Sequence, residues 1–201
     1  MNRLDGKVAL ITGSGGALFD SEFGLGFGGS SAFRFCQEGA TVIVSDINDD
    51  IGQQFTEELR EKGFNAHYKH LDTTNETEWK KTIDWIEKDF GKLDILVNNA
   101  GIAGRNDLFE TTEPDWDKVN DINSKGCFLG TKLGGILMRK NNFGSIINIA
   151  SMFGIIGSKA SLPYHASKGA VISMSKAAAI QLAPYKIRVN SVCPRFAATP
   201  L

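Results

Sequence analysis

The sequence predicts an α/β protein in which a doubly wound parallel sheet is covered by helices on both faces, in three layers. Short β-branched runs alternate with helix-like patterns along the whole chain, which is typical of strand–helix–strand units. The runs are almost continuously apolar, as expected for strands that are buried on both faces. The 201 residues contain no linker, internal repeat or low-complexity tract, so we expect a single domain over residues 1–201.

Six segments are expected to form the strands. In chain order they are residues 8–12, 41–45, 66–69, 93–97, 145–149 and 187–192. All but the third are short, mostly apolar runs rich in Val and Ile, a composition that favours strands. The segment 66–69 is the weakest candidate.

Helices are expected between these strands. Trp79, Ile83, Ile86 and Phe90 recur at spacings of four, three and four, and so form one apolar stripe that Gly91 ends. The other helical segments are one that opens within 24–29 and reaches residue 38, one over 51–59 that ends at residue 63, and two longer ones over 115–140 and 163–182.

The charge balance excludes several classes of protein. Lys and Arg total 22 and Asp and Glu total 23, which gives a net charge of −1 and a pI near 6.3. We therefore expect no nucleic-acid partner and no attraction to an acidic membrane surface. No run of the sequence is apolar enough for a membrane span, and no secretory signal is visible.

The cysteines and histidines predict no metal site. Cys36, Cys127 and Cys193 are odd in number and widely spaced, which indicates neither a disulfide framework nor a thiolate zinc site. His67 and His70 lie three apart in a strand-like segment, so their side chains should point to opposite faces. The cysteine pattern fits a reducing compartment, and we expect a cytoplasmic protein.

A glycine-rich segment predicts dinucleotide binding. Residues 24–29 match G-x-G-x-x-G and open a helix; glycine lets the backbone approach a pyrophosphate, and the first helical N–H groups bind the anion. Gly13 directly follows the first strand. Asp46 ends the second strand about 20 residues after the glycines, where a carboxylate meets a ribose hydroxyl. The alternative is a solvated glycine-rich loop.

Asp46 favours NAD over NADP as the cofactor. A carboxylate at that position accepts hydrogen bonds from ribose hydroxyls and repels a 2′-phosphate. No Arg or Lys lies between residues 13 and 32 to offset the repulsion. The alternative is that Asp46 is a turn residue, because three Asp fall within residues 46–50.

A tyrosine and a lysine suggest proton chemistry. Tyr164 and Lys168 are four residues apart in a helical segment and therefore share one face. An ammonium near a phenol favours the phenolate, so Tyr164 is a candidate general acid/base for an alcohol or ketone. Ser151 follows the strand at 145–149, at the end where open α/β sheets bind ligands.

Taken together, these motifs resemble the short-chain dehydrogenase/reductase family over nearly the whole chain. The resemblance rests on Thr12-Gly13 with the later Gly26-Phe27-Gly28, on Asp46, Asp72, Asn98-Asn99-Ala100-Gly101 and Asn123, and on Ser151 with Tyr164 and Lys168. It implies a Rossmann-like fold and hydride transfer between NAD(H) and the carbon of a small secondary alcohol or ketone. It also implies a homo-oligomer, either a dimer or a tetramer.

The resemblance assigns a role to each matching residue. Tyr164 would be the catalytic acid/base, with Lys168 tuning its pKa. Ser151 would polarise the substrate oxygen, and Asn123 would hold a water that relays protons. The cofactor-binding residues would be Gly13, Gly26, Phe27, Gly28, Asp46, Ile47, Leu71, Asp72, Asn99, Ala100, Gly101, Tyr164, Lys168, Pro194, Phe196 and Thr199. Asn98 is assigned a structural role.

Three features depart from the family pattern. Twelve residues, 14–25, separate Gly13 from Gly26 where the family has three, and we expect the inserted segment to loop outward from the phosphate site. The alternative is that its two carboxylates, Asp20 and Glu22, occupy that site or repel the cofactor. Arg195 follows Pro194 in place of the usual glycine. The chain stops some fifty residues short of the family length, so the last strand and helix of the family are missing.

Two functions of different classes stay open. The complete catalytic set favours an NAD-dependent alcohol dehydrogenase or ketone reductase. The insertion and the early end favour a catalytically impaired dinucleotide-binding or structural fragment. Within enzymes, 3-oxoacyl-carrier-protein reduction is the runner-up, although that activity usually goes with NADP(H) and fits Asp46 poorly.

Overall fold

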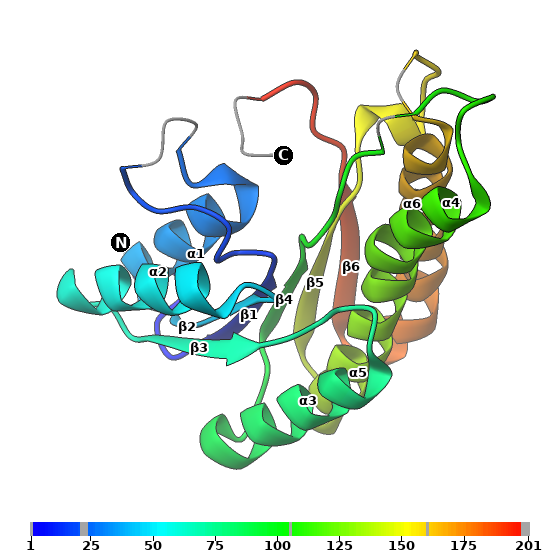
Figure 1. Cartoon of the computed structure of the whole chain (residues 1–201). Coiled ribbons are helices and arrows are strands. Elements are labelled where there is room, and N and C mark those ends of the chain that lie inside the picture. Colours follow the sequence, from blue (N-terminus) through cyan, green and yellow to red (C-terminus); the bar gives the residue numbers. More distant parts are fainter. Residues whose placement is uncertain (1, 21–23, 105, 160, 198–201) are drawn as a thin grey trace.

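A six-stranded parallel sheet forms the centre of the molecule (Figure 1). The computed structural model describes residues 2–20, 24–104, 106–159 and 161–197. Within them the strands are β1 (Val8–Thr12), β2 (Thr41–Asp46), β3 (Ala66–His70), β4 (Ile95–Asn98), β5 (Gly144–Ile149) and β6 (Ile187–Val192). All six lie close to their predicted positions, including the weak candidate that became β3.

Helices cover both faces of this sheet. In the described part of the chain the α-helices are α1 (Gly26–Gln37), α2 (Asp49–Glu61), α3 (Glu76–Phe90), α4 (Glu113–Asn120), α5 (Gly126–Lys140) and α6 (Leu162–Leu182). Figure 1 shows α1 and α2 on one face and α3, α5 and α6 on the other. The predicted three-layer, doubly wound architecture is therefore confirmed. None of the described helices combines the length and the apolar character needed to cross a bilayer.

Two hydrophobic cores fill the spaces between the layers, and β1 contributes to both. Because successive strand residues point to opposite faces, Ala9 and Ile11 pack with Phe55 under α1 and α2, whereas Leu10 packs with Trp79 under α3 and α5. All five of these residues are fully buried. The near-continuous apolar character of the strand sequences follows from this burial on both sides.

The order of the strands, β3-β2-β1-β4-β5-β6, places a switch point beside β1. Ile11 on β1 is the register partner of Val44 on β2 and of Val97 on β4. After β1 the chain adds β2 and β3 on one side of it and then crosses over to add β4 on the other side. The connections that follow β1 and β4 therefore lead away from each other. Open α/β sheets bind ligands in the crevice that such divergence leaves.

The helix predicted over 115–140 is interrupted. Thr112 caps the start of α4 in a capping box with Asp115, and a π-helical turn, η1 (Asp121–Lys125), then separates α4 from α5. A π turn accommodates an extra residue, which a pattern with a period of 3.6 does not reveal. The turn contains Asn123, a predicted site residue.

Candidate functional site

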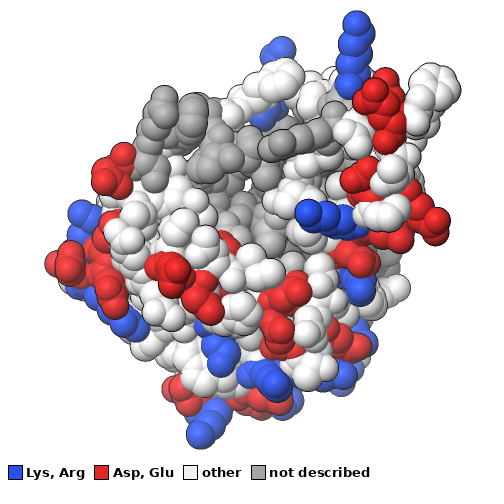
Figure 2. All heavy atoms as spheres, viewed as in Figure 1, with Lys and Arg blue, Asp and Glu red and all other residues white. Residues whose placement is uncertain are grey.

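A cavity of about 920 Å³ opens at the carboxyl ends of the strands. The segments that follow all six strands contribute to its wall. Figure 2 shows acidic and basic side chains interspersed around the rim of this side of the molecule. The cavity therefore lies where a doubly wound sheet binds its ligands.

Glycines bring the start of α1 against the end of β1. A Cβ atom on Gly28 would lie 2.5 Å from both the carbonyl oxygen of Gly13 and the side-chain nitrogen of Asn99, so no other residue fits there. Gly13 has a φ of 61° and packs against the backbone of Ala100. Among the described residues no side chain caps the start of α1, whose first N–H groups are available to an anion.

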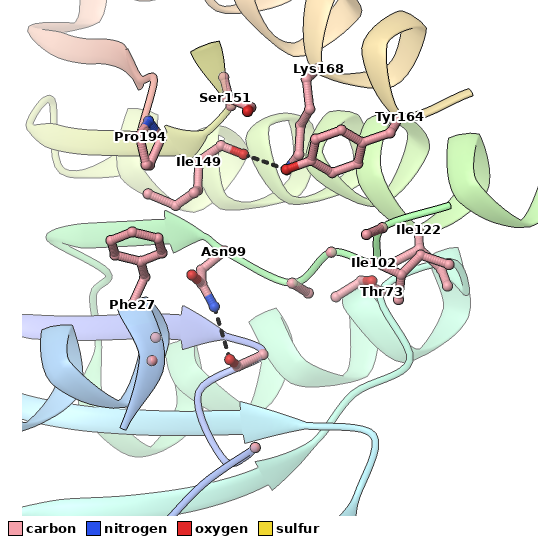
Figure 3. A pocket seen from close by; sticks show the side chains of 18 of the residues that line it. Phe27, Thr73, Asn99, Ile102, Ile122, Ile149, Ser151, Tyr164, Lys168 and Pro194 are labelled. Carbon is pink, nitrogen blue, oxygen red and sulfur yellow. Dashed lines mark hydrogen bonds between the residues drawn. The ribbon is translucent and has the colours of Figure 1, made fainter. Parts of the chain in front are cut away.

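Asn99 fixes the loop after β4 to the loop after β1. Its side-chain amide donates to the carbonyl oxygens of Thr12 and Gly13 at 2.9 and 2.8 Å (Figure 3). The hydroxyl of Thr12 in turn accepts the backbone N–H of Ala100 at 3.1 Å. These bonds hold the backbone of residues 99–101 along one wall of the cavity.

Acidic residues lie at the end of the cavity beside β2 and β3. The carboxylate of Asp46 accepts the N–H groups of Gly15 and Asn48, each at 3.1 Å, and Ile47 beside it is 63% exposed. Asp72 accepts the N–H and hydroxyl of Thr74 at 2.9 and 2.8 Å. Two carboxylates and an apolar side chain thus line this end, which we name the adenosine end for the ligand part that the sequence predicts there.

Tyr164, Lys168 and Ser151 line the opposite end of the cavity (Figure 3). Lys168 is 4% exposed, and its ammonium donates to the carbonyl oxygen of Ile149 at 2.8 Å. Its nitrogen lies 5.6 Å from the centroid of the Tyr164 ring. Burial disfavours the charged form and lowers the pKa of Lys168 to about 8. The hydroxyl of Ser151 accepts the N–H of Phe153 at 3.2 Å.

Asn123 lies behind this end and does not line the cavity. Its side-chain amide forms a pair of hydrogen bonds with the backbone of Ile102, at 2.8 and 2.9 Å, and donates to the hydroxyl of Ser167 at 3.0 Å. A Cβ atom on Gly101 would lie 3.1 Å from the Asn123 oxygen and 3.4 Å from the Lys168 nitrogen. Asn123 therefore supports the loop in front of Lys168.

Aromatic rings form an apolar wall beside Tyr164. The ring of Phe153 lies 6.5 Å from that of Tyr164, 5.2 Å from that of His165 and 5.8 Å from that of Phe196. Phe153 and Phe196 line the cavity, together with Met152. This wall is suited to a ligand with an apolar body.

The structure brings most of the predicted site residues together. Those that line the cavity are Gly13, Gly26, Phe27, Gly28, Asp46, Ile47, Leu71, Asp72, Asn99, Ala100, Gly101, Ser151, Tyr164, Lys168, Pro194 and Phe196. Thr199 lies outside the described residues. The sequence missed Thr73 and Thr74, which follow the predicted Asp72 directly, and it missed Lys118 and Ile122 because they fell inside the supposedly continuous helix.

The inserted segment packs on the outside of α1 and α2. The ring of Phe19 lies 4.9 Å from that of Phe33 and 5.7 Å from that of Phe55, with the ammonium of Lys62 4.6 Å from its centroid. Residues 17–20 do not line the cavity, in agreement with the outward path expected for them. Of the two acidic residues of the insertion, Asp20 is one of these residues outside the cavity, and Glu22 lies outside the described residues.

Comparison with known proteins identifies the family. The model of the short chain dehydrogenase family matches residues 7–201. The chain belongs to the short-chain dehydrogenase/reductase family. It is 41% identical over 201 residues to cyclopentanol dehydrogenase of Comamonas testosteroni, and the match spans the whole chain and 77% of that relative. This family consists of Rossmann-like oxidoreductases that bind NAD(P), as the sequence predicted.

Two other members of the family bear on the cofactor. The NADP-dependent (R)-specific alcohol dehydrogenase of Lentilactobacillus kefiri is 38% identical over 203 residues, spanning 100% of this chain and 77% of that relative. The solved structure of an NAD⁺-bound xylitol dehydrogenase superposes with a TM-score of 0.87 at 36% identity, covering 96% of this chain and 71% of that one. Similar chains therefore include both an NADP-dependent and an NAD⁺-bound protein.

Proposed function

We propose that this chain transfers a hydride between NAD(H) and a secondary alcohol or ketone, with Tyr164 as the general acid/base. The observation that carries the proposal is the grouping of Tyr164, the buried Lys168 and Ser151 at one end of a single cavity. The glycine-lined start of α1 lines the same cavity, and Asp46 lines its adenosine end. An alcohol and a dinucleotide held there would meet at the tyrosine.

The residues present fit NAD(H). The close approach of Gly28 to Gly13 leaves the backbone at the start of α1 free of side chains, as a diphosphate requires. Asp46 is placed to accept the adenosine ribose hydroxyls, and its charge would repel a 2′-phosphate, which supports NAD over NADP. When bound, the nicotinamide would supply or accept the hydride.

Tyr164 and Lys168 would handle the proton. Tyr164 would take the hydroxyl proton of an alcohol or return it to the oxygen of a ketone. Lys168 is held in place by its bond to the carbonyl of Ile149. Its depressed pKa, about 8, allows it to pass a proton on near neutral pH.

Ser151 and Asn123 would assist in different ways. Ser151 is placed to donate a hydrogen bond to the substrate oxygen, which stabilises charge on that oxygen. The bonds of Asn123 to Ile102 support a positioning role, in which it holds the loop in front of Lys168. Its role as the holder of a relay water stays a prediction of the family resemblance.

The apolar wall of Met152, Phe153 and Phe196 supports an apolar substrate. Aromatic side chains contribute large apolar area at fixed geometry, so a ring-shaped or branched secondary alcohol would fit the wall better than a charged one. The similar cyclopentanol dehydrogenase, named for a cyclic secondary alcohol, points in the same direction.

The proposal also includes a homo-oligomer. Helices α5 and α6 line a groove of about 430 Å³, into which α5 presents the exposed apolar side chains of Phe128 and Ile136. A patch of exposed apolar residues supports an interface. Light scattering coupled to gel filtration would give the mass in solution, and a monomer at micromolar concentration would contradict this part of the proposal.

The test of the function is the variant Tyr164→Phe, which removes one oxygen and keeps the ring. We expect at least a ~100-fold loss of NAD⁺ reduction with a panel of secondary alcohols, while NADH binding, followed by fluorescence, stays within a few-fold. The matched control is Tyr185→Phe, the same change outside the cavity. Retention of more than about a tenth of the activity would remove Tyr164 from the mechanism. NADH binding by the unmutated chain without any turnover would favour the impaired fragment instead.

A further inference from the structure

The adenosine end has two walls, one of Asp46 and Ile47 at the end of β2 and one of Leu71 and Asp72 after β3. His70 is next to both of them in the sheet. It is the last residue of β3 and the register partner of Asp46, the last residue of β2. Ile47 follows Asp46, and Leu71 and Asp72 follow His70; all four of these neighbours line the cavity. Figure 1 shows the ends of β2 and β3 side by side at the edge of the sheet.

The imidazole ring of His70 contacts a carboxylate on each side. Its Nδ1 lies 2.7 Å from Oδ1 of Asp49, the first residue of α2. Its Nε2 lies 3.6 Å from Oε2 of Glu78 in the first turn of α3. We name this set of Asp49, His70 and Glu78 the histidine bridge.

Each end of the histidine bridge is bonded to one wall of the cavity. Oε2 of Glu78 accepts the backbone N–H of Asp72 at 2.7 Å. On the other side the hydroxyl of Tyr68 donates to Asp49 at 2.7 Å, and it also lies 3.0 Å from the carbonyl oxygen of Asp46 as a second acceptor. A movement of His70 relative to its two carboxylates is thereby passed to the residues that line the adenosine end.

The protonation of the ring decides whether both contacts are favourable. A neutral imidazole has one N–H donor, so one of its nitrogens presents a lone pair to a carboxylate; a protonated imidazole donates on both sides. The titratable groups around it are Asp46 on β2, Asp49 on α2, Tyr68 on β3 itself, Asp72 after it and Glu78 on α3.

We propose that His70 is a positioning residue which, when protonated, ties the two walls of the adenosine end together and tightens the binding of a ligand that carries adenosine diphosphate. The inference rests on the proposed function only for the identity of that ligand. It concerns binding and does not require turnover.

The probe is ADP-ribose, which carries the adenosine half of the dinucleotide and lacks the nicotinamide, so it does not reach the chemistry of Tyr164. Its Kd is measured by titration calorimetry at about pH 6 and about pH 8, the range over which histidines exchange their proton, at constant ionic strength. We expect about threefold tighter binding at the lower pH, the size that a partly exposed ion pair provides.

The variant His70→Gln should bind ADP-ribose equally at both pH values. The matched control is His67→Gln on the same strand; the His67 ring packs against Phe90 at 5.0 Å, so this variant should keep the threefold ratio. Glu78→Gln keeps an acceptor for the N–H of Asp72 but removes one charge of the bridge, and should reduce the ratio.

The outcomes separate this inference from the function. A pH ratio near one in the unmutated protein, or the same ratio in His70→Gln, overturns the histidine bridge and leaves hydride transfer untouched. Binding with the expected ratio in a chain that turns over no alcohol supports the bridge and contradicts the proposed function. Failure of ADP-ribose to bind at any pH overturns the histidine bridge, while the proposed function is decided separately by NADH binding and turnover.

Discussion

Replacement of Lys168 by methionine should make the folded protein more stable at neutral pH while removing its turnover. The side chain of Lys168 is 4% exposed, and burial lowers its pKa from 10.5 to about 8. A shift of that size corresponds to ~3 kcal/mol of unfolding free energy, lost because the charged ammonium is taken out of water. Methionine of similar length fills the same space without that cost.

Part of this gain is offset by a lost hydrogen bond. The Lys168 ammonium donates to the carbonyl oxygen of Ile149, and leaving that acceptor unpaired costs ~1–2 kcal/mol. The net expectation at neutral pH is therefore a gain of ~1–2 kcal/mol, which for a chain of this length raises Tm by roughly 2–8 °C. The cost of the charge is fully present below about pH 8 and disappears as the pH rises through 10.5.

The assay is urea-induced unfolding followed by circular dichroism at about pH 7 and about pH 10. The advantage of Lys168→Met should shrink by ~2 kcal/mol at the higher pH, because the lysine is then neutral in the folded state and only the unfolded state still holds most of its charge, which leaves ~1 kcal/mol of the cost. Lys176→Met, an exposed lysine on the same helix, is the matched control and should change stability by less than ~0.5 kcal/mol. A variant that is less stable at neutral pH, or whose advantage is the same at both pH values, would refute the reasoning.

Three further predictions concern Asp46 and the inserted segment. Asp46→Ala should narrow the preference for NADH over NADPH in paired fluorescence titrations; equal affinities in the unmutated protein would remove Asp46 from the account of specificity. Phe19→Ala should lower stability in thermal unfolding by ~1–3 kcal/mol, since it removes a partly buried ring. Deletion of residues 17–25 should change NADH affinity only modestly, and conversion of a non-binder into a micromolar binder would show that the insertion blocks the site.

Much of the fold and most of the candidate site could be predicted because both depend on local patterns. The buried strands read as apolar runs, and the residues that follow them must lie at one edge of a parallel sheet. Asp46 and Ser151 could therefore be placed in one cavity without knowledge of any contact. The shared face of Tyr164 and Lys168 followed from the period of the helix, whereas their roles and the placement of Asn99 came from the family resemblance.

Features that depend on tertiary contacts were not visible in the sequence. Asn123, in the π turn, bonds through its side chain to Ile102 on another loop, and no local pattern in the sequence indicates such a bond. The position of Lys118 on the cavity wall likewise depends on how α4 packs in the folded protein. The packing of Phe19 against Phe33 on α1 and Phe55 on α2 could not be predicted, because it depends on how these two helices are arranged in the folded protein.

The strand order also determines how the sheet can grow while the chain is being synthesised. Each strand, as it is made, pairs with one that already exists: β2 with β1, β3 with β2, β4 with β1, β5 with β4 and β6 with β5. No strand has to be inserted between two paired neighbours. Until β4 is made, however, one edge of β1, which is buried throughout in the finished fold, has no partner, and such an edge is prone to pair with other chains. Chaperone binding to the nascent chain should therefore be strongest after β3 has been made and should fall once β4 is in place.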